Sequence, residues 1–183
     1  METKKITTPL KDSDTIGLRS GDNVTITGYI YTARDAAHKK LVELLDKGEK
    51  LPFDPSGQLI YFVGPTPPKP GHVIGSAGPT TSGRMNKYSP FLLDVGLKGM
   101  IGKGEMNVEV AEALKRNKGV YFVATGGAAA LIAKRITESE LVAYEELGAE
   151  AIRRLKVVDF PVIVAQDCHG GNLYVEGVKK YEK

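Results

Sequence analysis

Polar and apolar residues follow two different periods along this chain, and each period predicts one kind of element. Residues 22–31 (DNVTITGYIY) alternate β-branched and polar side chains, which predicts a strand. Residues 33–47 place their apolar side chains on one helical face with lysines opposite, and Gly48 is a suitable stop. The chain is therefore expected to change from strand to helix between these two stretches.

The remaining stretches continue this alternation. Compact apolar runs predict short strands at residues 59–63, 72–77, 100–104, 120–124, 162–165 and 173–176. Helical spacing predicts helices at residues 84–97, 108–117 and 126–136. Pro90 interrupts the first of these helices. Thr137, with Glu140 three residues later, fits a capping box and predicts a further helical segment.

The order of these elements predicts the fold class. Strands alternate with helices from Val73 onward, whereas the first third of the chain is richer in strand and turn. This order predicts an α/β fold in which a mixed sheet carries flanking helices. No stretch is long enough to act as a linker, so residues 1–183 are expected to form a single domain.

The composition excludes several classes of protein. Hydrophobic residues make up 42% and charged residues 26% of the chain, which excludes a disordered or fibrous protein. The 25 basic and 22 acidic residues give a net charge of +3, which predicts neither nucleic-acid nor membrane binding. The first ten residues do not resemble a secretory signal, and no run of about 18 apolar residues could span a membrane. We therefore expect a cytoplasmic protein.

Cys168 is the only cysteine in the chain. One thiol cannot form an internal disulfide, and it cannot by itself hold a zinc ion or an iron–sulfur cluster. Cys168 and His169 precede a Gly-Gly-Asn turn, and no second histidine has matching context, so a nucleophilic pair is not expected here. A metal site formed with Asp167 is also not expected, because adjacent residues of a strand point to opposite faces.

The segment Gly78-Pro-Thr-Thr-Ser-Gly-Arg84 concentrates groups that can bind an anion. It follows a predicted strand and precedes a predicted helix, where backbone N–H groups favour negative charge. Its glycines let a ligand approach the main chain, and Arg84 can grip a carboxylate or phosphate with two parallel hydrogen bonds. The alternative is that Thr81 or Ser82 only caps the helix while Arg84 is solvated.

Two further cations occupy similar junctions between strand and loop. Arg34 follows the first long predicted strand, at the end where open α/β sheets present ligand-binding residues. The alternative is a surface ion pair with Asp35, which would be worth little. Lys103 lies between two glycines and could present a point charge to an anion, although a simple turn lysine explains it equally well. Together with Arg84, these cations are about what a doubly charged small acid would need.

These motifs resemble a known family. The run GPTTSGRMNKYSPFLLDVGLKGMIGKGEM, residues 78–106, is similar to the β subunit, or C-terminal domain, of class I fumarases and the related L-tartrate dehydratases. The segments GYIYTARDAAHKK (residues 28–40), GGAAALIAKRI (126–136) and DFPVIV (159–164) match in the same order. The resemblance therefore covers nearly the whole chain.

The resemblance implies a fold, a reaction and a partner. It implies a swivelling β/β/α domain and a hydro-lyase that interconverts fumarate and L-malate with a four-iron, four-sulfur (4Fe-4S) cluster. The three cysteine ligands of the cluster lie on the α subunit, which agrees with the single Cys168 here. The chain is thus expected to bind no metal itself and to be the β half of a hetero-oligomer. Its expected partners are the α subunit and a small dicarboxylate substrate.

The resemblance also implies roles for five residues of this chain. Arg34, Arg84 and Lys103 would hold the substrate carboxylates, and Thr81 would contact the substrate. Thr80 corresponds to the threonine proposed to remove the C3 proton of malate. Because a threonine hydroxyl is a weak base, Thr80 would need a partner, for which a carboxylate of the α subunit is the candidate.

Two alternatives to a fumarase β subunit stay open at this point. The first is the β subunit of an L-tartrate dehydratase, which belongs to the same class of enzyme. The second is a non-catalytic module that binds a phosphate or carboxylate through residues 80–84. Such a module would bind its ligand without a partner chain, whereas a lyase β subunit would show little or no turnover alone.

Overall fold

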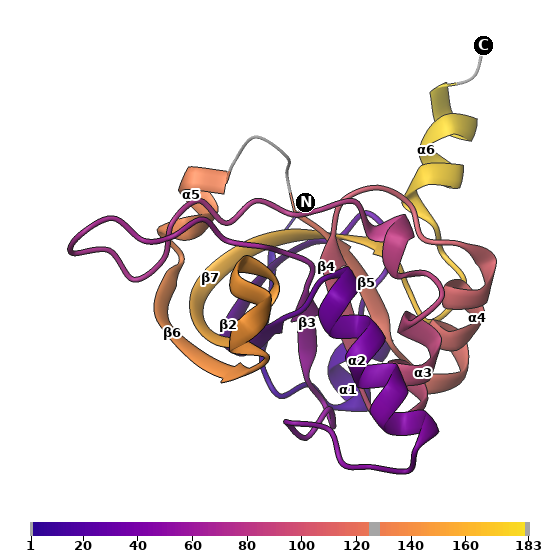
Figure 1. The fold of residues 1–183 in the computed structure, drawn as a ribbon. Helices are drawn as coiled ribbons and strands as arrows, with labels where there is room; N and C mark the ends of the chain where they lie inside the picture. The colour runs from indigo at the N-terminus through magenta and orange to yellow at the C-terminus, as the bar shows by residue number, and fades with distance from the viewer. Residues whose placement is uncertain (1, 125–128, 182–183) are drawn as a thin grey trace.

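The structure is a computed structural model that describes residues 2–124 and 129–181 (Figure 1). Its strands are β1 (Lys4–Thr7), β2 (Asn23–Thr32), β3 (Leu59–Tyr61), β4 (Gly99–Gly102), β5 (Val120–Val123), β6 (Ile136–Ala143) and β7 (Ile152–Gln166). Its α-helices are α1 (Asp12–Ile16), α2 (Asp35–Asp46), α3 (Ser89–Asp94), α4 (Val108–Asn117), α5 (Ala129–Ala133) and α6 (Leu173–Tyr181). Two short 3₁₀ helices complete the described elements, η1 (Ser82–Met85) and η2 (Glu145–Glu150).

The described strands form one mixed sheet that closes on itself. Neighbouring strands from β1 to β5 are parallel, whereas β7 runs antiparallel to β2, β5 and β6. Because β7 pairs with both β2 and β5, the strands β2, β3, β4, β5 and β7 form a closed barrel. The remaining strands extend it, β1 along the first half of β2 and β6 along the first half of β7.

Two apolar clusters hold this arrangement together. One contains side chains of the barrel strands such as Leu59, Tyr61 and Phe160. The other joins the opposite faces of these strands, including Ile60, to the helices α2, α3 and α4, which lie together on one side of the barrel (Figure 1). Successive residues of β3 are therefore all buried, which explains the compact apolar run in the sequence.

The mixed sheet with flanking helices confirms the predicted fold class at this level. The strand at residues 22–31 and the helix at 108–117 are also confirmed. The helix at residues 84–97 is divided into η1 and α3, and Pro90 lies in the first turn of α3, where its missing N–H costs no hydrogen bond. The Gly126-Gly127 start of the Ala-rich helix lies outside the described residues.

Three predicted elements are wrong. Residues 72–77 form no strand, and they lie in an irregular segment after the proline-rich stretch. Thr137 and Glu140 lie in β6, where pairing with β7 replaces the predicted helix. Residues 173–176 begin α6 instead of forming a last strand. For residues 136–143 a short local pattern fitted two structures, and the distant strand β7 decided between them.

No helix within residues 2–124 and 129–181 has the length and apolar character needed to cross a membrane.

Candidate functional site

The predicted site residues lie after the carboxyl ends of three neighbouring parallel strands. Arg34 follows β2, and Lys103 follows β4 directly. Thr80 is joined to the end of β3 because its backbone N–H donates to the carbonyl oxygen of Phe62 at 2.8 Å. The carboxyl ends of parallel strands meet at one edge of a sheet, which is where such folds bind ligands.

The turn that carries Thr80, Thr81 and Arg84 is fastened to the end of β4. Thr81 and Lys103 form a parallel β-bridge. The Ser82 N–H donates to the carbonyl oxygen of Lys103 at 2.9 Å, and the Lys103 N–H donates to the Ser82 hydroxyl at 2.9 Å. These bonds fix Lys103 beside the turn, so the two motifs that the sequence separates form one structure.

A buried contact below this turn was missed by sequence reasoning. The Tyr121 hydroxyl of β5 lies 2.7 Å from the Ser82 hydroxyl and 2.6 Å from the carbonyl oxygen of Gly104. Burial raises the pKa of Tyr121 far above its usual range, so the hydroxyl stays protonated and available as a donor. Ser82 is therefore a buried anchor of the turn. The predicted alternative, a helix cap formed by the Thr81 or Ser82 side chain, does not occur, because η1 begins without a side-chain cap.

Arg84 connects the candidate base to the neighbouring helix. Its Nη2 donates a hydrogen bond to the Thr80 hydroxyl oxygen at 2.5 Å. Its Nε forms an ion pair with Asp35 Oδ1 at 3.3 Å. A guanidinium that donates to a hydroxyl oxygen favours negative charge on that oxygen. The pairing thus acts in the direction that a proton-accepting Thr80 requires.

Arg34 is held by two carboxylates. Its Nε lies 3.9 Å from Asp35 Oδ2, and its Nη2 lies 3.5 Å from Glu150 Oε1. The other oxygen of Glu150 accepts a hydrogen bond from the backbone N–H of Ala36 at 3.2 Å. Glu150 comes from η2, 116 positions after Arg34. The contact depends on the tertiary fold and could not be predicted from the local sequence. The predicted alternative for Arg34, an ion pair with Asp35, is thus also present.

Two atoms of this cluster retain hydrogen-bonding capacity. Arg34 Nε and Asp35 Oδ2 are buried, and neither has a hydrogen-bond partner within the part of the chain that the structure describes. The two atoms lie 3.9 Å from each other, which is within ion-pair distance but too long for a hydrogen bond. Both atoms lie at the start of α2, beside the candidate substrate arginines.

His38 is buried in the first turn of α2. Its side chain is fully shielded, and the ring lies edge-on against Phe62 at 5.2 Å between centroids. Its Nδ1 lies 2.8 Å from the carbonyl oxygen of Arg34, which this nitrogen can reach only as a donor. Burial lowers the pKa of His38 to about 4, so the ring is neutral at pH 7 and braces the first turn of α2.

The Asp167–Asn172 segment is structural. The Asp167 carboxylate accepts hydrogen bonds from the backbone N–H groups of Ser20 at 2.8 Å, His169 at 2.8 Å and Gly171 at 2.9 Å. Its oxygens are therefore occupied in holding a turn. Within residues 2–124 and 129–181, no group of three His, Cys, Asp or Glu side chains is placed to hold a metal ion.

The cluster that the resemblance implies does not fit this chain. An iron–sulfur cluster of that kind takes three or four thiolates, and the sequence holds a single cysteine. The Cys168 sulfur lies 3.9 Å from the carbonyl oxygen of Thr15, on a segment apart from the arginines. Any such cluster would need thiolate ligands from outside these 183 residues.

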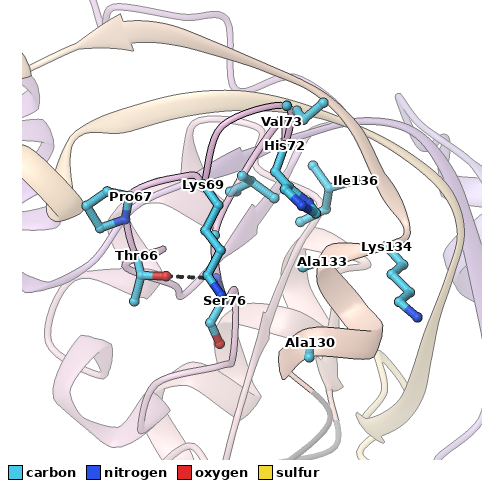
Figure 2. A pocket seen from close by; sticks show the side chains of 13 residues that line it. Thr66, Pro67, Lys69, His72, Val73, Ser76, Ala130, Ala133, Lys134 and Ile136 are labelled. Atoms are coloured by element: carbon cyan, nitrogen blue, oxygen red, sulfur yellow. Dashed lines mark hydrogen bonds between the residues drawn. The ribbon is translucent and has the colours of Figure 1, made fainter.

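A separate cavity of about 580 Å³ lies away from the site residues. It is bounded by residues 66–76 on one side and by α5 on the other, as Figure 2 shows. None of Arg34, Thr80, Thr81, Arg84 and Lys103 lines it.

The structure thus places Arg34 and Arg84 together around Asp35, at the carboxyl ends of the parallel strands of a closed barrel. A sequence model of the family described as "Fumarase C-terminus" matches residues 3–177. The chain belongs to this family.

Named relatives are of two kinds. The chain is 42% identical over 181 residues to the putative L(+)-tartrate dehydratase subunit beta of Methanocaldococcus jannaschii, which covers 95% of this chain and 93% of the relative. It is 36% identical over 183 residues to the L(+)-tartrate dehydratase subunit beta of Escherichia coli strain K12, and the match covers 97% of this chain and 90% of the relative. It is 40% identical over 159 residues to the anaerobic class I fumarate hydratase of the same strain, covering 86% of this chain but 29% of the relative.

Proposed function

We propose that this chain is the β subunit of a two-chain hydro-lyase that interconverts fumarate and L-malate. The relatives in which a similar sequence makes up 90% or more of the chain are named beta subunits. In the fumarate hydratase relative the matched region is 29% of the polypeptide, so most of that enzyme lies outside it. Both observations support a domain that works with a second one.

The observation that carries the proposal is the contact of Arg84 with Thr80 beside Arg34. Arg84 touches the Thr80 hydroxyl at 2.5 Å, and Asp35 lies within ion-pair distance of both arginines. A dicarboxylate has two anionic groups, and a guanidinium pairs with a carboxylate through parallel hydrogen bonds. Arg34, Arg84 and Lys103 would therefore bind the carboxylates, and Thr81 would contact the substrate from the adjoining position.

The chemistry of this chain's residues follows from their charges. Removal of the C3 proton of malate puts negative charge on the neighbouring carboxylate, and cations already in place stabilise that charge. The proton would pass to the Thr80 oxygen, which can accept it only after losing its own proton. The Arg84 contact favours that anionic form, and the residue that first removes the Thr80 proton would come from the α subunit.

We further propose that the α subunit carries a 4Fe-4S cluster, since the single cysteine here cannot hold one. Such a cluster would supply a Lewis-acidic iron.

L-tartrate is the second candidate substrate. The relative at 42% identity matches this chain over almost its full length and is named for tartrate. The two reactions use the same class of chemistry, because tartrate is a four-carbon dicarboxylate with one more hydroxyl than malate. The cation cluster serves either substrate.

The experiment is anaerobic assay of the chain with and without its cluster-bearing α subunit, with fumarate, L-malate and L-tartrate in parallel. Loss of fumarate absorbance that requires both chains is the expected result, and the ratio of kcat/KM values identifies the substrate. An Arg84→Ala complex serves as the control for the site and should lose turnover while still assembling. An inactive wild-type complex in which the isolated β chain still binds a dicarboxylate would instead support an anion-binding module.

A further inference from the structure

Asp35 lies within ion-pair distance of both candidate substrate arginines, Arg34 and Arg84. It is the first residue of α2, and its two carboxylate oxygens face different partners. Oδ1 lies 3.3 Å from Arg84 Nε, and Oδ2 lies 3.9 Å from Arg34 Nε. The two arginines are 50 positions apart in the sequence, so Asp35 joins the loop after β2 to the turn after β3.

The contact with Asp35 determines which edge of the Arg84 guanidinium is available. Nε faces Asp35 and Nη2 reaches Thr80, so neither contact uses Nη1. The opposite edge, formed by Nη1 and the second hydrogen of Nη2, is left to grip a carboxylate in two-pronged fashion. The Arg84 side chain is 47% exposed, so without such contacts it would sample many rotamers.

The two arginines depend on Asp35 to different degrees. Arg34 has a second carboxylate, Glu150, at 3.5 Å. For Arg84, Asp35 is the one carboxylate within ion-pair distance among residues 2–124 and 129–181. Loss of the Asp35 charge should therefore release Arg84 while leaving Arg34 paired.

We propose that Asp35 is a positioning residue of this site, which holds Arg84 so that one edge of its guanidinium meets Thr80 and the other meets a substrate carboxylate. The inference rests on the proposed function, because it assigns Asp35 a part in that reaction. Asp35 acts through Arg84 and needs no contact with the substrate.

This role predicts a separation of kcat from KM. The Asp35 charge partly offsets the positive field of the arginines, so its removal strengthens the general attraction for a dianion. The same removal frees Arg84 from the orientation that the transition state requires. Release of Arg84 also weakens its hold on a substrate carboxylate, so a positioning role lowers kcat by more than it raises KM.

The test compares variants of the assembled α–β enzyme. Asp35→Asn keeps the size of the side chain and removes the charge, and Asp35→Glu keeps the charge on a longer stem. Asp94→Asn is the matched control, because Asp94 also pairs with an arginine, Arg116, at 2.8 and 2.7 Å, but on α3 away from the site. A crystal structure of the Asp35→Asn complex gives the position of Arg84 directly.

Asp35→Asn is expected to lower kcat by about tenfold or more with a smaller change in KM, because an ångström of misplacement costs that much or more. Asp35→Glu should recover part of the loss, and Asp94→Asn should behave as wild type. In the crystal structure, Arg84 of Asp35→Asn should have left Thr80. If Asp35→Asn does not fold, the kinetics of Asp35→Glu and its Arg84 position give the answer.

Three results would overturn the inference. They are a wild-type kcat in Asp35→Asn, an equal loss in Asp94→Asn, and an Arg84–Thr80 contact that persists in the Asp35→Asn crystal structure. A wild-type complex that is inactive on fumarate and on L-tartrate would count against the proposed function instead. In that case the crystal structure still decides whether Asp35 positions Arg84.

Discussion

Arg84 donates a hydrogen bond from Nη2 to the hydroxyl of Thr80, four positions earlier in the chain, at 2.5 Å. The cation that would bind a carboxylate and the oxygen that would accept a proton are therefore already one unit within this chain. The turn that joins them is fixed through Ser82 to the end of β4. A single short motif thus delivers both groups at a set separation.

Replacement of Thr80 by valine should abolish most of the turnover of the assembled enzyme. Valine keeps the shape of threonine but has no hydroxyl, so it removes both the proton acceptor and the partner of Arg84 Nη2. Loss of a general base lowers rates by about 10² to 10⁴-fold. We expect kcat to fall within that range and KM to change little, measured by steady-state assay under anaerobic conditions.

Thr80→Ser is the matched control because it retains the hydroxyl. It should keep most of the wild-type kcat. Equal losses in the serine and valine variants would assign Thr80 a packing role only.

Replacement of Gly102 by alanine should destabilise the site and the domain together. A Cβ on Gly102 would overlap the Ser82 hydroxyl, which is fixed between the Lys103 N–H and Tyr121. Overpacking of this kind costs about 3 kcal/mol, because neither the strand nor the anchored turn can move freely. Urea unfolding of Gly102→Ala and of the wild-type protein measures the loss of unfolding free energy.

Gly83→Ala provides the comparison for this measurement. The nearest atom to a Cβ at Gly83 is Asn86 Nδ2 at 3.8 Å, an ordinary contact distance. Its unfolding free energy should stay within about 0.5 kcal/mol of wild type, as for most surface changes. Equal stability of both variants would show that the Ser82 turn yields easily.

His38 should make the stability of the domain fall as the pH drops below 6.5. Burial lowers the pKa of His38 from 6.5 to about 4, so the folded state holds the ring neutral while the unfolded chain gains a proton. Because the unfolded state binds more protons in this range, stability is retained above pH 6.5 and is lost progressively toward pH 4. The loss from this one residue amounts to about 3 kcal/mol.

His38→Gln removes this titration and isolates its effect from that of the carboxylates. Unfolding free energies of both proteins at a series of pH values between 4 and 7 measure the difference in slope. Parallel curves for the two proteins would mean that His38 is not held neutral by burial.

Only part of the candidate site could be predicted from local patterns. Arg34 and Lys103 follow strands that the sequence indicates, and parallel strands bring their carboxyl ends to one edge. The strand at residues 72–77 that should precede Arg84 does not form, and the Arg84 turn reaches this edge because the Thr80 N–H donates to the carbonyl oxygen of Phe62. Glu150 and Tyr121 gave no such signal. Their contacts with Arg34 and Ser82 cross 116 and 39 positions and depend on the closed barrel.

His38 and β6 show how tertiary contacts override local patterns. His38 lies beside the apolar stripe of α2, and the ring of Phe62 shields it only after β3 has packed against that helix. Thr137 and Glu140 carry the spacing of a helix start, but β7 offers their segment a partner strand. A capping box is worth about 1 kcal/mol, which a strand pairing of this length outweighs.

The long strand β7 also determines when the barrel can close during synthesis. It is the last of the five barrel strands to be synthesised, and its pairs with β2 join residues more than 120 positions apart. Until residues 152–166 have left the ribosome, the sheet is an open ribbon, and Arg34 has no Glu150 to meet. A nascent chain therefore carries no finished arginine cluster until synthesis has passed β7.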